Sequence, residues 1–133
     1  MTNIEIADQK HKQGYNCAQA VVCTYCENFG VDEQTAFKMA EAFGAGMGSM
    51  ENTCGAVSGL LMLLGLKNSS GNTQNSTKAS TYKLAKEAIE KFKEMNKSVV
   101  CSELKGLNGK EILRSCPGCI EDACKIAEEY ITK

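Results

Sequence analysis

Eight cysteines carry the chemistry that this sequence of 133 residues offers. Four of them fall where helices are predicted to begin: Cys17, Cys54, Cys101 and Cys116. The partial positive charge of a helix N-terminus stabilises a thiolate and lowers the pKa of the thiol. A thiolate is the form of cysteine that attacks disulfides and binds metal ions. These positions therefore favour thiol–disulfide chemistry or a metal site, and either function requires the four sulfurs to converge in space.

Cys54 is the strongest single candidate, because it follows the cap residue Thr53 and is expected at the first position of an apolar helix. The glycine-rich segment Gly44–Gly48 should turn as a hairpin and let the chain pass close to Cys54. Burial acts in the opposite direction and raises the pKa of a thiol. We predict that Cys54 is the attacking thiol or a direct metal ligand, with Cys17 as its partner.

The other four cysteines have weaker patterns. Cys26 and Cys124 lie on apolar helix faces and are expected to be core residues. Cys23 and Cys26 form a C-x-x-C spacing in mid-helix, where no free N–H groups stabilise a thiolate. Cys116 and Cys119 form a C-x-x-C that straddles a helix start, although no thioredoxin-like strand precedes it. Cys119 is therefore able to resolve a disulfide or sulfenic acid at Cys116, and its role stays open.

Other polar residues give little indication of a site. The glycines of Gly44–Gly48 follow a helix rather than a strand, so they do not match a dinucleotide-binding loop. His11 is the one histidine, and it is expected on the surface of the first helix. Glu121 and Asp122 suit the first turn of the last helix, where acidic side chains favour the helix dipole. We assign neither a catalytic role.

Composition narrows the class of protein. The net charge is −1, with 15 basic and 16 acidic residues, so no nucleic acid or membrane partner is expected. The N-terminal residues show no signal-peptide pattern, and a cytoplasmic location is predicted. In a reducing compartment a high cysteine content indicates metal binding or thiol chemistry rather than a disulfide framework. The length suits one domain over residues 1–133, with an unknown redox partner.

The predicted fold is all-α, a single bundle of five to six helices around a buried helix at about Thr53–Leu64. That run is apolar or small on every side, and it is too short to span a bilayer. Gly65 is expected to end it, and Gly55 with Gly59 should let a neighbouring backbone approach closely. A charge at Leu61 should unfold the domain.

Caps and apolar stripes predict the surrounding helices. The first helix begins at the Thr2–Glu5 capping box and ends near Gly14. The second helix is capped by Asn16 and ends at Gly30. The third helix is capped by Asp32. A long helix over 77–96 should face inward with Tyr82, Ala85, Ile89 and Phe92, after an exposed loop at 68–76. The last helix begins at Pro117, with Cys116 as its cap, and buries Ile120, Ala123, Cys124, Ala127, Tyr130 and Ile131.

Five blocks in order resemble the C_GCAxxG_C_C family: Tyr15–Val21, Phe43–Gly46, Cys54–Gly59, Cys101–Leu104, and Cys116–Pro117 with Ile120, Asp122 and Ala123 after it. The four signature cysteines of the family match Cys17, Cys54, Cys101 and Cys116. Thr53 stands where the family name has glycine. The resemblance implies a small helical protein with a redox role assigned from its cysteines, and it supplies no substrate.

Three functions follow as hypotheses. The first is thiol–disulfide redox chemistry, in which a second cysteine resolves the attacked or oxidised one. The second is an iron–sulfur cluster or metal site that uses the same four cysteines, although their spacing matches no common ferredoxin or zinc-ribbon pattern. The third is an interaction module without catalysis. The sequence does not separate the first two.

Overall fold

The computed structural model describes residues 1–107 and 109–131, and the apolar central run forms its middle helix, α5 (Gly55–Asn68). Around α5 lie α1 (Asn3–Lys12), α2 (Cys17–Tyr25), η1 (Cys26–Phe29), α3 (Glu33–Ala40), η2 (Glu41–Phe43), α4 (Gly44–Met47), α6 (Lys78–Asn96), α7 (Cys101–Leu104) and α8 (Cys116–Ile131). Apart from one isolated bridge between Thr53 and Val100, no strand occurs in the ranges described. The predicted all-α class is confirmed.

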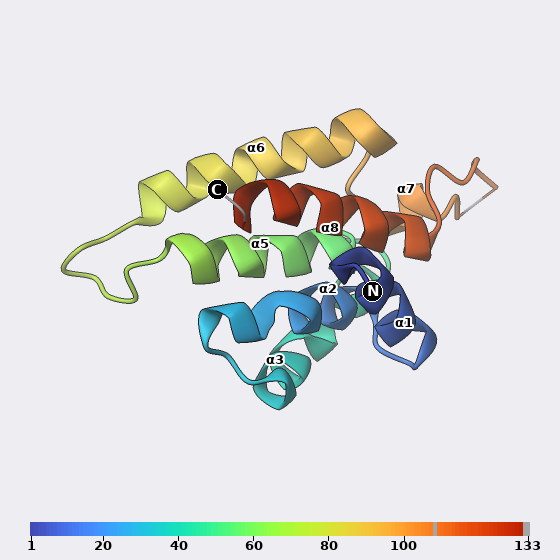
Figure 1. The fold of residues 1–133 in the computed structure, drawn as a ribbon. Helices are drawn as coiled ribbons and strands as arrows, with labels where there is room; N and C mark the ends of the chain where they lie inside the picture. Colours follow the sequence, from blue (N-terminus) through green and yellow to red (C-terminus); the bar gives the residue numbers. More distant parts are fainter. Residues whose placement is uncertain (108, 132–133) are drawn as a thin grey trace.

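The helices form layers on both sides of α5 (Figure 1). Helices α6 and α8 lie on one side of it, and α2 lies on the other side with α1 and α3 beyond. Helices α2, α5 and α8 all begin at the end of the molecule where α7 lies, and α1 packs between α2 and α8 there. Three positive helix N-termini are therefore directed toward one end of the bundle.

Large apolar side chains of α5 fill the core. The largest fully buried side chains are Tyr25, Leu60, Leu63, Leu64, Phe92, Leu104, Ile120 and Ile126. Leu61 and Met62 are only half-buried, so α5 is enclosed on every side only through its first half. A charge at Leu60, rather than at Leu61 as predicted, would be placed in the centre of the core.

The end of α5 also differs from the prediction. Gly65 was expected to end the helix, but α5 continues to Asn68, and the Ser69 N–H bonds to the Gly65 carbonyl at 2.9 Å. Leu66 and Lys67 are good helix formers, and no left-handed residue interrupts them. The expectation for the two earlier glycines is confirmed. A Cβ at Gly59 would lie 2.9 Å from the Ala18 carbonyl oxygen, so α2 approaches α5 closely because glycine stands there.

Helix α6 is turned relative to the predicted stripe. Tyr82 is 67% exposed, whereas Ala88 and Phe92 are fully buried and Leu84 is half-buried. Tyr82 lies two residues before Leu84, or about 200° around a helix, so it faces away from the core. Ala85 and Ile89 lie at the edge of the interface, half-buried.

Several other local predictions agree with the structure. Thr2 and Asn16 each form a capping box, Asp32 caps α3, and Gly30 adopts a left-handed conformation after η1. Residues 69–76 are all exposed, as expected for the polar loop. In the described parts of the chain, no helix is both long enough and apolar enough to cross a membrane.

Candidate functional site

Five cysteines line one cavity of about 160 Å³ at the end of the bundle where α2, α5 and α8 begin. The lining residues are His11, Asn16, Cys17, Ala45, Cys54, Gly55, Cys101, Leu104, Lys105, Arg114, Cys116 and Cys119. The expected convergence of Cys17, Cys54, Cys101 and Cys116 is therefore observed. Cys119 joins them, and all eight cysteines of the chain are free thiols.

Backbone pairing brings Cys54 beside Cys101. The Cys54 N–H donates to the Val99 carbonyl at 2.6 Å, and the Cys101 N–H donates to the Asn52 carbonyl at 2.9 Å. These bonds flank the bridge between Thr53 and Val100. Since backbone donors and acceptors of both segments are used in this pairing, two cysteines that are distant in sequence are fixed at one wall of the cavity.

The glycine-rich segment supports that wall by close approach. Ala45 and Gly46 are both left-handed, with φ of 52° and 58°. A Cβ at Gly46 would lie 2.5 Å from the Cys101 Cβ, so any side chain there would displace Cys101. The segment was expected to pass close to Cys54. Ala45 does share the cavity with Cys54, but the tightest contact of Gly46 is with Cys101.

Two helix starts lie one residue from their predicted positions. Cys54 is the cap of α5 rather than its first helical residue, because the preceding Thr53 is held in the bridge to Val100. Cys116 is the first residue of α8 rather than its cap. Ser115 takes the capping role there, since its hydroxyl accepts the Gly118 N–H at 3.2 Å.

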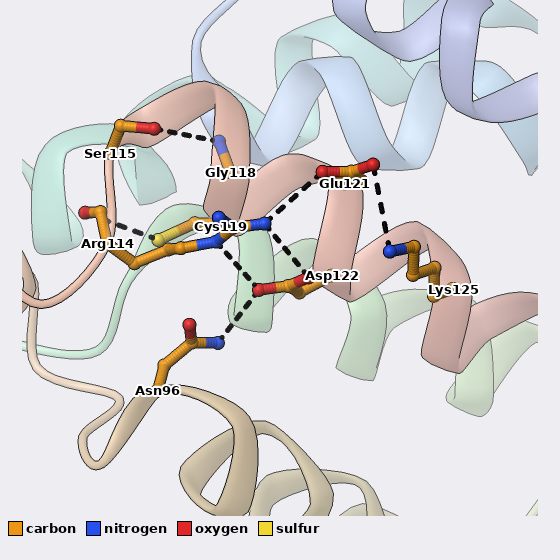
Figure 2. Close-up of polar contacts among 8 residues, drawn as sticks. All are labelled: Asn96, Arg114, Ser115, Gly118, Cys119, Glu121, Asp122 and Lys125. Carbon is orange, nitrogen blue, oxygen red and sulfur yellow. Dashed lines mark hydrogen bonds and ion pairs between the residues drawn. The ribbon is translucent and has the colours of Figure 1, made fainter.

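An ion-paired arginine holds the start of α8 (Figure 2). The Arg114 Nε donates to Asp122 Oδ2 at 2.9 Å, and the Arg114 Nη2 donates to Glu121 Oε2 at 3.2 Å. Asn96 Nδ2 also donates to Asp122 Oδ2, at 3.1 Å, and Asp122 is 4% exposed. The two acidic residues were predicted only to favour the helix dipole. In the structure they position Arg114, which lies over Gly118 where a side chain would clash with the guanidinium.

Cys116 has the most acidic thiol at the site. A hydrogen bond with the Cys17 thiol lowers the pKa of Cys116 to about 5 in spite of burial, and the positive charges of Lys105 and His11 act in the same direction. The same hydrogen bond, together with burial, raises the pKa of Cys17. Cys17 is thus the proton donor of the pair, and Cys116 is the thiolate.

Cys54 and Cys119 form a second pair of this kind. A hydrogen bond with the Cys119 thiol lowers the pKa of Cys54 to about 7, and the backbone N–H groups of Ala56 and Val57 add to the effect against burial. The pKa of Cys119 is raised by the same bond and by burial. Cys17 was predicted as the partner of Cys54, and that pairing stays a prediction; the thiol that lowers the pKa of Cys54 is that of Cys119.

His11 and Lys105 belong to this site, although sequence reasoning placed neither there. Lys105 lies four residues after Cys101, a spacing that puts both on one side of a helical turn and could have indicated the contact. Burial lowers the pKa of Lys105, but its interactions with the neighbouring cysteines, chiefly with the Cys116 thiolate, outweigh burial and raise it. His11 reaches the cavity because α1 packs between α2 and α8, which no pattern in the sequence shows.

The remaining cysteines are poor thiolates. Burial raises the pKa of Cys101, partly offset by the charge of Lys105. Burial also raises the pKa of Cys124 to about 12, and that of Cys23 to about 12. Cys26 and Cys124 are fully buried and line no part of the cavity, as expected for core residues.

The metal hypothesis concerns the same residues. Across residues 1–107 and 109–131, no group of three or more His, Cys, Asp and Glu side chains is arranged to hold a metal ion. The pKa shifts link the thiols in two pairs, Cys17 with Cys116 and Cys54 with Cys119. A shared iron–sulfur cluster or metal ion at these cysteines stays a prediction.

Comparison with known proteins identifies a family. The pattern of the family described as "Putative redox-active protein (C_GCAxxG_C_C)" matches residues 15–130, nearly the whole chain. This all-α cysteine protein belongs to that family. Searches of curated proteins and of solved structures give no match.

Proposed function

We propose that this protein is a thiol–disulfide oxidoreductase in which Cys116 is the attacking thiolate and Cys17 is the resolving thiol. The observation that carries the proposal is the placement of Cys116. It is the one cavity cysteine that is only half-buried, and Lys105 and Cys17 both act on its sulfur. Membership of a family described as redox-active agrees with this assignment.

The reaction balances with a disulfide as the oxidant. The Cys116 thiolate attacks one sulfur of the substrate disulfide, forms a mixed disulfide and releases the other substrate sulfur as a thiolate. Cys17 then loses its proton and attacks the Cys116 sulfur, which releases the second substrate sulfur. The protein gains a disulfide between Cys17 and Cys116, and the substrate becomes two thiols that take up two protons.

The cavity limits what reaches the sulfur. Its volume of about 160 Å³ is below the roughly 300–1,000 Å³ of a typical ligand pocket. One sulfur with its neighbouring carbons fits such a space, whereas a bulky cofactor does not. We therefore expect the substrate to insert only its disulfide while its remaining atoms stay outside.

The test is reaction of the fully reduced protein with oxidised glutathione, followed by mass spectrometry of trapped disulfides. Cys116→Ser should abolish the mixed disulfide, and Cys17→Ser should accumulate it at Cys116. Cys124→Ser, a buried control on the same helix, should react like the unaltered protein. Unchanged reaction in Cys116→Ser would refute the proposal. Iron, zinc or labile sulfide in anaerobically purified protein, lost in Cys116→Ser, would favour the metal hypothesis instead.

A further inference from the structure

Cys119 is a cavity cysteine outside the four positions that the family resemblance selects. It is 2% exposed, and its sulfur lies 4.0 Å from the Arg114 carbonyl oxygen (Figure 2). It lines the same cavity as Cys54, and the interaction between the two thiols raises the pKa of Cys119. A buried thiol that lines the same cavity as four other cysteines is placed for reaction rather than only for packing, and the proposed exchange at Cys116 leaves it unused.

Helix α8 connects the two thiol pairs. Cys116 and Cys119 lie three residues apart, so they occupy one face of the first turn of α8. Cys17 and Cys54, their respective partners, come from α2 and from the cap of α5, which Gly55 and Gly59 bring into close contact. The cavity therefore contains one pair with a half-buried member, Cys116, and one pair that is buried throughout, and the two pairs lie within range of charge interaction.

We propose that Cys54 and Cys119 form a second redox pair, which takes over the disulfide first made between Cys17 and Cys116. This proposal rests on the proposed function, because the first disulfide must arise by exchange with a substrate. Its consequence is that the protein reduces two substrate disulfides before it needs reduction itself, with four thiols oxidised in total.

The transfer balances as two exchange steps. The Cys54 thiolate attacks the Cys17 sulfur of the Cys17–Cys116 disulfide, and Cys116 leaves as a thiolate. Cys119 then loses its proton and attacks the Cys54 sulfur, which releases Cys17, and Cys17 takes up that proton. One disulfide has moved inward, no electrons have left the protein, and Cys116 is again a free thiolate.

The surroundings favour this direction. Cys116 is the better leaving group, since its neighbours Lys105 and His11 stabilise the negative charge that it acquires. The buried position receives the disulfide, which has no charge, and burial penalises an uncharged group less than a thiolate. The acidity of Cys54, whose pKa is about 7, provides the internal nucleophile at neutral pH.

The experiment follows the position of the disulfide in time. Reduced protein receives one equivalent of oxidised glutathione, samples are quenched with acid and alkylated, and disulfides are mapped by mass spectrometry. The Cys17–Cys116 disulfide should appear first and be replaced by Cys54–Cys119. In Cys119→Ser the first disulfide should persist. When oxidised glutathione is added in excess to a second sample, the number of oxidised thiols should fall from four in the unaltered protein to two in this variant. Cys54→Ser should behave in the same way, and Cys124→Ser should behave like the unaltered protein.

The outcomes separate the two proposals. A Cys17–Cys116 disulfide that forms and then persists in the unaltered protein overturns the transfer and leaves the proposed function intact. Absence of any disulfide at Cys116 overturns both. Circular dichroism melting of each variant checks that loss of the second disulfide does not arise from unfolding. If Cys119→Ser does not fold, Cys54→Ser gives the same readout from a different helix.

Discussion

The two C-x-x-C segments of this chain have the same spacing and opposite surroundings. In the first segment both thiols donate to backbone carbonyls. The Cys23 thiol donates to the Glu33 carbonyl at 3.7 Å, and the Cys26 thiol donates to the Cys23 carbonyl at 3.9 Å. A carbonyl acceptor holds the thiol in its protonated form, and burial raises the pKa of both cysteines. This segment is part of the core between α2 and α3.

At Cys116 and Cys119 the contacts favour ionisation of one thiol in each pair. Cys17 and Lys105 lower the pKa of Cys116, and Cys119 lowers that of Cys54, while the Cys119 thiol also donates to the Arg114 carbonyl at 4.0 Å. The segment opens a helix, whereas the other lies within and at the end of one. The comparison teaches that the spacing only brings two sulfurs to one face; the hydrogen-bond partner and the nearest charge decide whether they react.

The largest expected difference between the segments is in alkylation rate. At pH 7 the thiolate fraction differs by ~10⁵ between a pKa of about 5 at Cys116 and one of about 12 at Cys23. A more acidic thiolate is a weaker nucleophile, and this difference reduces the expected ratio of alkylation rates by about 1,000-fold. Alkylation of Cys116 should therefore be ~100-fold faster than alkylation of Cys23. Competitive labelling with iodoacetamide, read by peptide mass spectrometry, measures the ratio.

The pH dependence has a definite sign. Labelling of Cys116 should rise as pH increases through about 5 and then level off, because the depressed pKa leaves the thiolate fully formed at neutral pH. Labelling of Cys23 should still be rising at pH 9. Equal alkylation rates of Cys116 and Cys23 at pH 7, or a Cys116 profile that rises only above pH 8, would contradict the difference between the two segments.

Next in size is the effect of Asp122→Asn. Asp122 is a buried partner of Arg114 and Asn96, so removing its charge should lower the free energy of unfolding by about 2 kcal/mol, ~30-fold in the equilibrium. Glu121→Gln is the matched control, because Glu121 contacts the same guanidinium at 44% exposure and should cost below about 0.5 kcal/mol. Urea denaturation followed by circular dichroism measures both, and equal costs would contradict the role assigned to Asp122.

Lys105→Met should have a smaller effect, confined to the reactive segment. Removing the positive charge beside Cys116 raises the pKa of that thiol, so less thiolate is present in acid and labelling below pH 5 should slow roughly 10-fold. Cys23 labelling should not change. Lys93→Met, an exposed lysine on α6, serves as the control. A Cys116 profile that does not move would exclude Lys105 as its charge partner.

The smallest effect is expected for Cys26→Ala. Cys26 is fully buried, so loss of its sulfur should cost about 1 kcal/mol of stability, ~5-fold in the equilibrium. Reaction with oxidised glutathione should proceed at the unaltered rate. Slower exchange in this variant, at equal folded fraction, would show that the mid-helix segment takes part in the chemistry.

The sequence predicted the architecture better than the details of the site. Caps at Thr2, Asn16 and Asp32 were identifiable because each depends on one side chain and the N–H groups next to it. The ends of α5 and the facing of α6 were misplaced, since they depend on tertiary contacts. The bridge at Thr53 delays the start of α5, and the position of the core decides which side of α6 is buried.

The four expected cysteines do converge, but their pairing was not visible in the sequence. Which thiol donates to Cys54 depends on the rotation of α8, and that rotation is fixed partly by Arg114 with Asp122. His11 was dismissed as a surface residue because only the packing of α1 brings it to the cavity. Contacts between distant helices are set by the packed fold and are not encoded in any local spacing.

The bridge between Thr53 and Val100 has a consequence for how the chain matures. Its two residues lie at opposite ends of a long loop that includes α5 and α6, so the wall of the cavity forms only after that loop has closed. The segment with Cys116 and Cys119 leaves the ribosome later still. Until it arrives, Cys17, Cys54 and Cys101 lack the helix that completes the cavity, and the nascent chain depends on its surroundings to keep those thiols from pairing incorrectly.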